Sequence, residues 1–170
     1  VEAVLERPDQ LRAAMEGIEV LFHAAAVYAY IDDGREQEIM DAAVKGAEAA
    51  LRAAADARVR KVVLTSSAVT VPLTAPGAPP STEADWTGDT RVTYIRAKTE
   101  AERLAWPLAK ELGLNLVTVL PGGICGPGFA RNTPSLDLVE AMMYGAFRMG
   151  VPDANFPYVD VRDVVSAHLM

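Results

Sequence analysis

Short apolar runs alternate along the sequence with longer segments whose apolar residues recur every three or four positions. The run KVVLTSS at 61–67 is rich in β-branched residues and has no polar face, which is typical of a parallel strand covered on both sides. Similar runs of strand length occur at 18–22 (IEVLF) and 115–120 (NLVTVL), and VEAVL at 1–5 favours a further short strand. The apolar pattern therefore predicts several separate strands.

The longer segments have the periodicity of amphipathic helices. Between about 36 and 55 the apolar residues fall on one stripe, as expected for a helix that packs against a sheet. Residues 71–90 contain four prolines among several Gly, Ser and Thr, so we interpret this stretch as a loop. Further helices are predicted at 8–17, at about 92–112 with Gly113 as the stop, at about 135–149, and from Val161 with Asp160 as N-cap.

Strands and helices thus alternate, which implies βαβ crossovers and a parallel sheet. The sequence predicts an α/β fold with a doubly wound, Rossmann-like parallel sheet. In such sheets ligands bind beyond the carboxyl ends of the strands. Three segments follow predicted strands at that end, HAAA at 23–26, TSSA at 65–68 and PGGICGPG at 121–128. Together with the start of the 92–112 helix, they should face one crevice.

Composition narrows the class of protein. The 170 residues are 51% hydrophobic and 23% charged, which indicates one globular domain. The net charge of -7 argues against a nucleic-acid partner, and no apolar run reaches the length of a membrane span. The single Cys125 excludes an internal disulfide and suits a reducing, cytoplasmic compartment. Because the chain opens at Val1 and stops at Met170 inside an apolar pattern, we expect it to be an excerpt of a longer protein.

Tyr94 and Lys98 are one helical turn apart, so their side chains can reach the same ligand. An ammonium beside a phenol favours the phenolate and lowers the pKa of the tyrosine, which makes proton transfer feasible near neutral pH. A hydroxyl of Ser66 or Ser67, at the end of a buried strand, can hold a carbonyl or alcohol oxygen against that phenol. These groups suit carbonyl–alcohol interconversion, for which a nicotinamide cofactor would supply the hydride.

Each of these residues also has a purely structural interpretation. Tyr94 and Lys98 can be surface residues whose stems cover apolar neighbours, while the two serines can end the strand with turn-forming hydroxyls. The position of Tyr94 and Lys98 after a serine-bearing strand end favours the catalytic interpretation. His23 is better interpreted as a strand-end residue than as a metal ligand, because no cluster of ligand-type residues surrounds it. We predict no metal site.

Five segments resemble the extended short-chain dehydrogenase/reductases, the NAD-dependent epimerase/dehydratase family: LFHAAAVY, KVVLTSSAVTV, YIRAK, LPGGICGPG and FPYVDVRDVVSAHL. The resemblance covers nearly the whole chain and is nearest to the branch of dihydroflavonol reductases and cinnamoyl-CoA reductases. It implies reduction of a small aldehyde or ketone with NADP or NAD, NADP being favoured. It is compatible with a homodimer of the full-length protein. It also implies that about 122–160 contributes to a small substrate lobe beside a partial NAD(P)-binding domain.

The resemblance also implies residue roles. Ser67 matches the catalytic serine, Tyr94 the general acid/base, and Lys98 its electrostatic partner, which also binds the nicotinamide ribose. Asp160 and Asp163 are expected to be structural caps rather than catalysts. The positions that match cofactor-binding segments of the family are Ala24, Ala25, Tyr28, Thr65, Ser66, Tyr94, Lys98, Pro121, Gly122, Gly123 and Ile124.

The sequence also departs from the family pattern. The phosphate loop G-x-x-G-x-x-G and the strands around it have no counterpart, so we expect the first βαβ unit to be absent and dinucleotide binding by 1–170 to be weak. Ala43 stands where many relatives have an asparagine that helps a proton relay. Two alternatives remain open, a nucleotide-sugar epimerase or dehydratase and a non-catalytic fragment. Met142, Met143 and Met149 are expected to be packing residues or walls of the substrate pocket.

Overall fold

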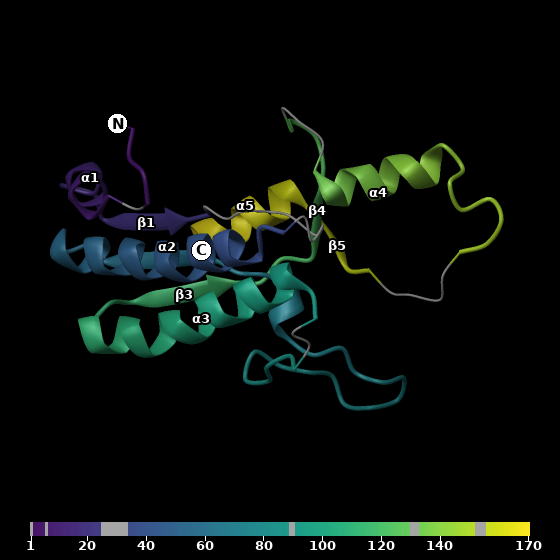
Figure 1. Cartoon of the computed structure of the whole chain (residues 1–170), viewed down its shortest axis with the longest axis horizontal. Helices are drawn as coiled ribbons and strands as arrows, with labels where there is room; N and C mark the ends of the chain where they lie inside the picture. The colour runs from purple at the N-terminus through teal and green to yellow at the C-terminus, as the bar shows by residue number, and fades with distance from the viewer. Residues whose placement is uncertain (1, 6, 25–33, 89–90, 130–132, 152–155) are drawn as a thin grey trace. The chain divides into compact units, whose positions relative to one another are not determined.

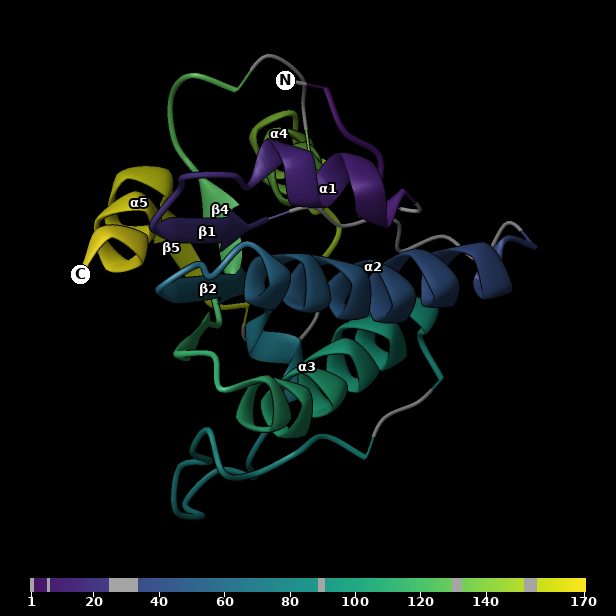
Figure 2. The ribbon, with the colours of Figure 1, turned by 90° about the vertical axis from the view of Figure 1, so that its left-hand side faces the viewer.

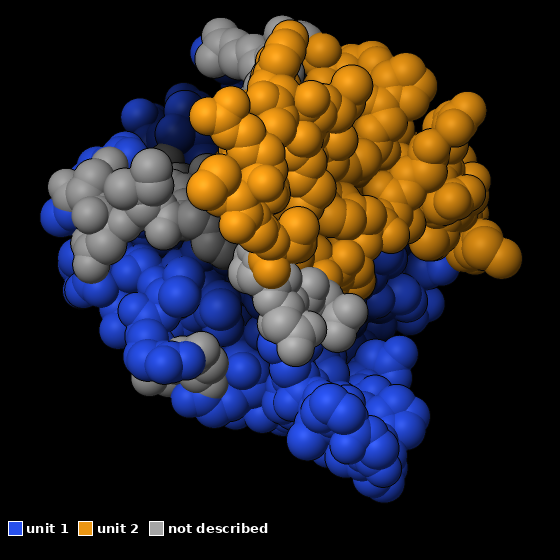
Figure 3. Space-filling model, turned by 90° about the vertical axis from the view of Figure 1, so that its right-hand side faces the viewer, with its two compact units in different colours: residues 1–120 blue, residues 121–170 orange. Residues whose placement is uncertain are grey.

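The structure, a computed structural model, describes residues 2–5, 7–24, 34–88, 91–129, 133–151 and 156–170. The chain divides into two compact units, Val1–Leu120 and Pro121–Met170, which Figure 3 shows in different colours. Both units combine helices with parallel strands, so the predicted α/β class is confirmed. The elements of unit 1, labelled in Figure 1, are α1 (Pro8–Ala14), β1 (Val20–His23), α2 (Glu36–Asp56), β2 (Lys61–Thr65), the 3-10 helix η1 (Ala68–Thr70), α3 (Thr93–Leu112) and β3 (Leu116–Val119).

The sheet of unit 1 is parallel, with β2 between β1 and β3. Its register aligns Leu21 with Val62 and Val62 with Leu116, so these side chains share one face of the sheet. On the opposite face Val63 is buried, as predicted for a central strand, whereas Phe22 on the neighbouring edge strand is 45% exposed. Burial is therefore greatest along β2, whose carboxyl end leads into Ser66 and Ser67.

Small side chains allow the two long helices of unit 1 to lie close together. The residues buried along α2 and α3 include many alanines, such as Ala47, Ala54, Ala101 and Ala105, and the distance between packed helices depends on the side chains at their contact. Figures 1 and 2 show the two helices side by side. The core between helices and sheet contains Leu11, Met15, Leu51, Ala53, Ala54, Val59, Val62, Leu64, Ala105, Leu108, Ala109 and Leu116.

Unit 2 consists of β4 (Gly123–Cys125), α4 (Pro134–Met143), β5 (Tyr158–Asp160) and α5 (Val161–Leu169). The two strands pair in parallel, and the Gly123 N–H donates to the Pro157 carbonyl just before the ladder. Asp160 is the N-cap of α5, as predicted, and its carboxylate accepts from the Arg162 backbone N–H. None of the helices among the described residues has the length and apolar character that a membrane-spanning segment requires.

Two sequence predictions of secondary structure were wrong, and two short strands were missed. Residues 2–5 form no strand, because Val4 hydrogen-bonds to Gln10 and Arg7 and so joins the turn that leads into α1. β4 and β5 were not predicted; each has three residues, too few for an alternating pattern to be visible. The helix predicted to reach 149 ends at Met143, because Gly145 adopts a left-handed conformation (φ 77°) and its N–H closes back onto the Met142 carbonyl.

Candidate active site

The carboxyl end of β2 passes directly into the segment that carries the two predicted serines. The Ser66 N–H donates to the Val119 carbonyl at 2.8 Å, which continues the hydrogen-bonding pattern of β2 and β3 by one residue. Ser67 then adopts an extended backbone and caps η1, with its hydroxyl accepting from the Val69 N–H at 3.4 Å. Both serines are buried. The strand end is therefore a fixed structure rather than a loose turn.

A pocket in unit 1 lies where this strand end meets the first turns of α3. Tyr94 is only 7% exposed, so its interpretation as a surface residue is wrong. Lys98 donates from Nζ to the Thr65 carbonyl at 3.1 Å, which ties α3 to the end of β2. Ser67 adjoins the pocket through Ser66 but does not line it. The lining residues are His23, Ala43, Ala47, Leu64, Thr65, Ser66, Tyr94, Ala97, Lys98, Ala101 and Glu102.

The electrostatics of the pocket follow from burial. Burial lowers the pKa of the Lys98 ammonium, and the negative charge of Glu102 opposes that shift. Burial also lowers the pKa of His23, and the nearby positive charge of Lys98 lowers it further. His23 is the last residue of β1, as predicted, and stays neutral beside a charged lysine near neutral pH. Among the described lining residues, Lys98 is thus the cation of the pocket, and Tyr94 lines the same pocket.

Glu102 is a buried residue of the pocket that the sequence interpretation missed. Its side chain, on a residue 4% exposed, accepts hydrogen bonds from the Ser66 hydroxyl at 2.5 Å and from the Thr70 hydroxyl at 3.1 Å. Tyr94, Lys98 and Glu102 follow one another at intervals of four residues on α3, so all three lie along one side of the helix. That spacing, Y-x-x-x-K-x-x-x-E, was the available signal.

The remaining predicted cofactor residues fall in three places. Ala24 follows β1 and is exposed, while Ala25 and Tyr28 lie outside the described residues. Pro121 to Ile124 belong to unit 2, where two glycines have a structural reason of their own. A Cβ on Gly122 would lie 2.3 Å from the Pro157 carbonyl oxygen, and one on Gly123 would lie 2.9 Å from the Tyr158 ring. The packing of unit 2 itself therefore excludes a side chain at Gly122, whereas a side chain at Gly123 would require the Tyr158 ring to move.

The chemistry of the pocket fits the nicotinamide end of a dinucleotide. An ammonium, a phenol and a serine hydroxyl at the end of a parallel strand suit the hydroxyl groups of a ribose. The sequence contains no G-x-x-G-x-x-G segment to bind the diphosphate. No group of three or more His, Cys, Asp or Glu residues that could hold a metal ion occurs among the residues placed by the structure.

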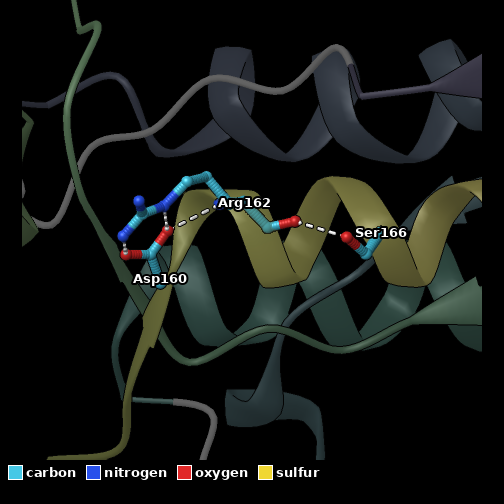
Figure 4. A network of polar contacts seen from close by, with 3 residues as sticks. All are labelled: Asp160, Arg162 and Ser166. Atoms are coloured by element: carbon cyan, nitrogen blue, oxygen red, sulfur yellow. Dashed lines mark hydrogen bonds and ion pairs between the residues drawn. The ribbon is translucent and has the colours of Figure 1, made fainter.

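The two acidic residues near the C-terminus lie in unit 2. Asp160 binds the Arg162 guanidinium through both carboxylate oxygens, at 2.9 and 2.6 Å, and accepts from the Arg162 N–H at 2.8 Å (Figure 4). This arrangement lowers the pKa of Asp160 to about 2, chiefly through the side-chain hydrogen bonds of Arg162. Asp160 is therefore a structural cap, in agreement with the sequence interpretation.

Met142, Met143 and Met149 are 43%, 82% and 93% exposed, so they do not pack in a core of unit 2, and their alternative place as walls of a substrate pocket stays a prediction. Met142 and Met143 belong to α4, which has no buried residue. At the N-terminus of α4, the hydroxyl of the N-cap residue Thr133 accepts a hydrogen bond from the Leu136 N–H. Unit 2 does not use its methionines as a core.

Comparison with known proteins gives a consistent result. The sequence profile described as "NAD dependent epimerase/dehydratase family" matches residues 1–170. Cinnamoyl-CoA reductase 1 of Arabidopsis thaliana is 32% identical over 182 residues, covering 99% of this chain and 50% of that protein. Tetraketide alpha-pyrone reductase 2 of the same plant is 29% identical over 167 residues, covering 92% and 52%.

Solved structures share the fold. RMD from Pseudomonas aeruginosa, complexed with NADPH, superposes with a TM-score of 0.78 at 21% identity, covering 99% of this chain and 61% of that one. The chain spans about half the length of the curated relatives that it matches.

Proposed function

Because the chain belongs to the NAD-dependent epimerase/dehydratase family, we propose that the protein is an NAD(P)-dependent reductase that converts an aldehyde or ketone into an alcohol. The similarity to cinnamoyl-CoA reductase 1 and tetraketide alpha-pyrone reductase 2 supports a carbonyl substrate. The observation that carries the proposal is that Tyr94, which is buried, and Lys98 line one pocket at the end of β2. A phenol beside an ammonium is suited to giving a proton to a carbonyl oxygen.

The proposed roles follow from this geometry. Tyr94 donates its proton to the substrate oxygen as the alcohol forms, and the Lys98 ammonium stabilises the phenolate that remains. Ser67, next to the pocket, orients the substrate oxygen through its hydroxyl. When bound, the nicotinamide supplies the hydride. Lys98 would hold its ribose hydroxyls, with Thr65 and Ser66 beside the nicotinamide half.

Substitution of Tyr94 tests the proposal directly. In the full-length protein, Tyr94→Phe should lower turnover by about 100-fold or more while NADPH affinity stays nearly unchanged, because the ring still packs but the proton is gone. Lys98→Ala should weaken both turnover and cofactor binding. The matched control is Tyr144→Phe, which removes the same hydroxyl from a residue 84% exposed in unit 2 and should leave turnover intact. Retention of most activity by Tyr94→Phe would refute the assignment.

Cofactor titration of residues 1–170 tests the two alternatives. We expect no measurable binding of NADPH or NADH by calorimetry, because no glycine-rich helix N-terminus of the family type is present to receive the diphosphate. Micromolar binding would show that the phosphate site is elsewhere, with PGGICGPG as the first candidate. In the full-length protein, conversion of a nucleotide sugar without net consumption of NADPH would favour an epimerase over a reductase.

A further inference from the structure

Glu102 is an ionisable residue at the pocket to which the Ser-Tyr-Lys chemistry assigns no role. Burying a carboxylate is costly unless hydrogen bonds and an opposite charge compensate for the lost water. Both forms of compensation are present, because the Ser66 and Thr70 hydroxyls donate to Oε2 and Lys98 lies one turn away on α3. We therefore expect the Glu102 carboxylate to fix the positions of Ser66 and Thr70 and to favour the charged form of Lys98.

The two hydroxyl donors bracket the proposed catalytic serine. Ser66 precedes Ser67, and Thr70 follows it at the end of η1. The Thr70 N–H donates to the Ser67 carbonyl at 3.0 Å and closes the turn, while the single hydroxyl proton of Thr70 is shared between that carbonyl, at 3.0 Å, and Glu102 Oε2, at 3.1 Å. Since the Ser66 and Thr70 hydroxyls both donate to Oε2 of Glu102, this one carboxylate fixes the backbone around Ser67 relative to α3.

The same carboxylate acts on the charge of Lys98. The ionisable groups that line the pocket are His23 on β1 and Tyr94, Lys98 and Glu102 on α3, while α2 contributes only Ala43 and Ala47. His23 repels the ammonium only when protonated, and burial lowers the pKa of that imidazole. Glu102 is therefore the one anion among the described lining residues that offsets the burial of Lys98.

We propose that Glu102 is a positioning residue, whose carboxylate fixes the 66–70 turn against α3 and favours the charged form of Lys98, one turn earlier on the same helix. The consequence for catalysis rests on the proposed reductase function, whereas the effect on Lys98 does not. Glu102 touches neither the substrate nor the cofactor in this role. It acts through Ser66, Thr70 and Lys98.

The test is the titration of Lys98 in the intact protein, followed through the 13Cε resonance of its side chain. Glu102→Gln keeps the shape and removes the charge, and should lower the titration midpoint of Lys98 by about one pH unit. The matched control is Glu100→Gln on the same helix, whose partly exposed carboxylate pairs with Arg103 and should leave the midpoint unchanged. An unchanged midpoint in Glu102→Gln, or an equal shift in both variants, would overturn the proposal.

Two further variants keep the test decisive if Glu102→Gln fails to fold. Ser66→Ala removes one of the two hydroxyls that join the 66–70 turn to Glu102 but keeps the charge of the carboxylate, so amide exchange across the turn should become faster while Lys98 titrates closer to the wild type than in Glu102→Gln. Glu102→Asp keeps the negative charge and should retain a midpoint closer to that of the wild type than Glu102→Gln does. If Ser66→Ala leaves amide exchange of the 66–70 turn unchanged, the carboxylate does not fix the turn against α3, and the proposal fails.

Kinetics separate this proposal from the proposed function. In an active reductase, Glu102→Gln should move the basic limb of the kcat/KM pH profile to lower pH, and Glu102→Asp should largely restore it. The Lys98 titration needs neither cofactor nor substrate. A failed reductase assignment, seen as full turnover in Tyr94→Phe, therefore leaves the titration test intact. An unchanged Lys98 midpoint in Glu102→Gln would overturn the role of Glu102 while leaving reductase activity open.

Discussion

The two units of the chain differ in how they use apolar side chains. Among the described residues, every buried apolar side chain except Val164 lies in unit 1. Unit 2 instead has short strands and helix caps, and large apolar side chains such as Met143, Tyr144 and Leu169 are more than 70% exposed. The pocket with Tyr94 and Lys98 lies in the densely packed unit. The difference indicates that Tyr94 and Lys98 lie beside a packed core, whereas unit 2 depends mainly on the β4–β5 ladder and on helix caps.

The largest effect should come from truncating a leucine in each unit. Leu51 is 3% exposed in the core of unit 1, and Leu51→Ala should lower the free energy of unfolding by about 2–5 kcal/mol. Leu169→Ala makes the same chemical change at a residue 72% exposed, and should cost less than about 0.5 kcal/mol. Urea unfolding followed by circular dichroism measures both. Equal losses would mean that the packing of the two units does not differ as described.

Replacing a hydrogen-bonded threonine in each unit compares a buried hydrogen bond of unit 1 with a helix cap of unit 2. Thr70 is 1% exposed and donates to Glu102, so Thr70→Val should lower the global free energy of unfolding by about 1–3 kcal/mol. Thr133 caps α4, and Thr133→Val should cost about 1 kcal/mol, confined to that helix. Amide hydrogen exchange distinguishes the two, because only Thr70→Val should speed exchange throughout unit 1. Faster exchange in unit 1 after Thr133→Val would contradict local stabilisation of α4.

The Asp160–Arg162 pair predicts a pH effect in unit 2. The pKa of Asp160 is lowered to about 2 in the folded protein, below the value of about 3.9 for an unperturbed aspartate. The contribution of this carboxylate to stability is therefore complete above about pH 4 and is lost as the pH falls towards 2. Arg162→Ala should raise the titration midpoint of Asp160 in NMR, and the control Arg148→Ala should not. A normal midpoint in the wild type would refute the ion pair.

The smallest effect is expected at a surface ion pair of unit 1. Lys45 lies 2.8 Å from Asp41 on α2, but its side chain is 73% exposed. Lys45→Ala should change the free energy of unfolding by no more than about 0.5 kcal/mol, because water and salt screen such pairs. Thermal unfolding of the wild type and of Lys45→Ala, at low and at high salt, measures this change in the free energy of unfolding. If Lys45→Ala lowered the free energy of unfolding as much as Thr70→Val, burial would not explain the difference between these two residues of unit 1.

The sequence predicted the long elements well because their signals are local. The apolar stripe of α2 and the β-branched run of β2 are visible within a single segment. β4 and β5 depend on pairing between segments more than 30 residues apart, and a three-residue strand with a glycine has no pattern of its own. The early stop of α4 depends on one turn at Gly145.

The candidate site was predicted in part for a similar reason. The spacing of Tyr94 and Lys98 is a feature of one helix and was recognised from the sequence. Glu102 was missed because a carboxylate on an amphipathic helix normally indicates the solvent side. Its burial depends on Ser66 and Thr70, which reach it from 36 and 32 residues earlier in the chain. Hydrogen-bond partners so distant in the sequence cannot be recognised from the helix itself, and the only local signal was the four-residue spacing of Glu102 from Lys98.

The close approach of residue 122 to Pro157 constrains how unit 2 can evolve. Alanine is the smallest change available to a glycine, yet its methyl group would stand 2.3 Å from a backbone oxygen that no rotamer change can move aside. A substitution at 122 can therefore be accepted only after the 157 segment has shifted. The two positions, 35 residues apart in the chain, should vary together among descendants of this sequence. Position 122 should stay glycine in lineages where the backbone at 157 is retained.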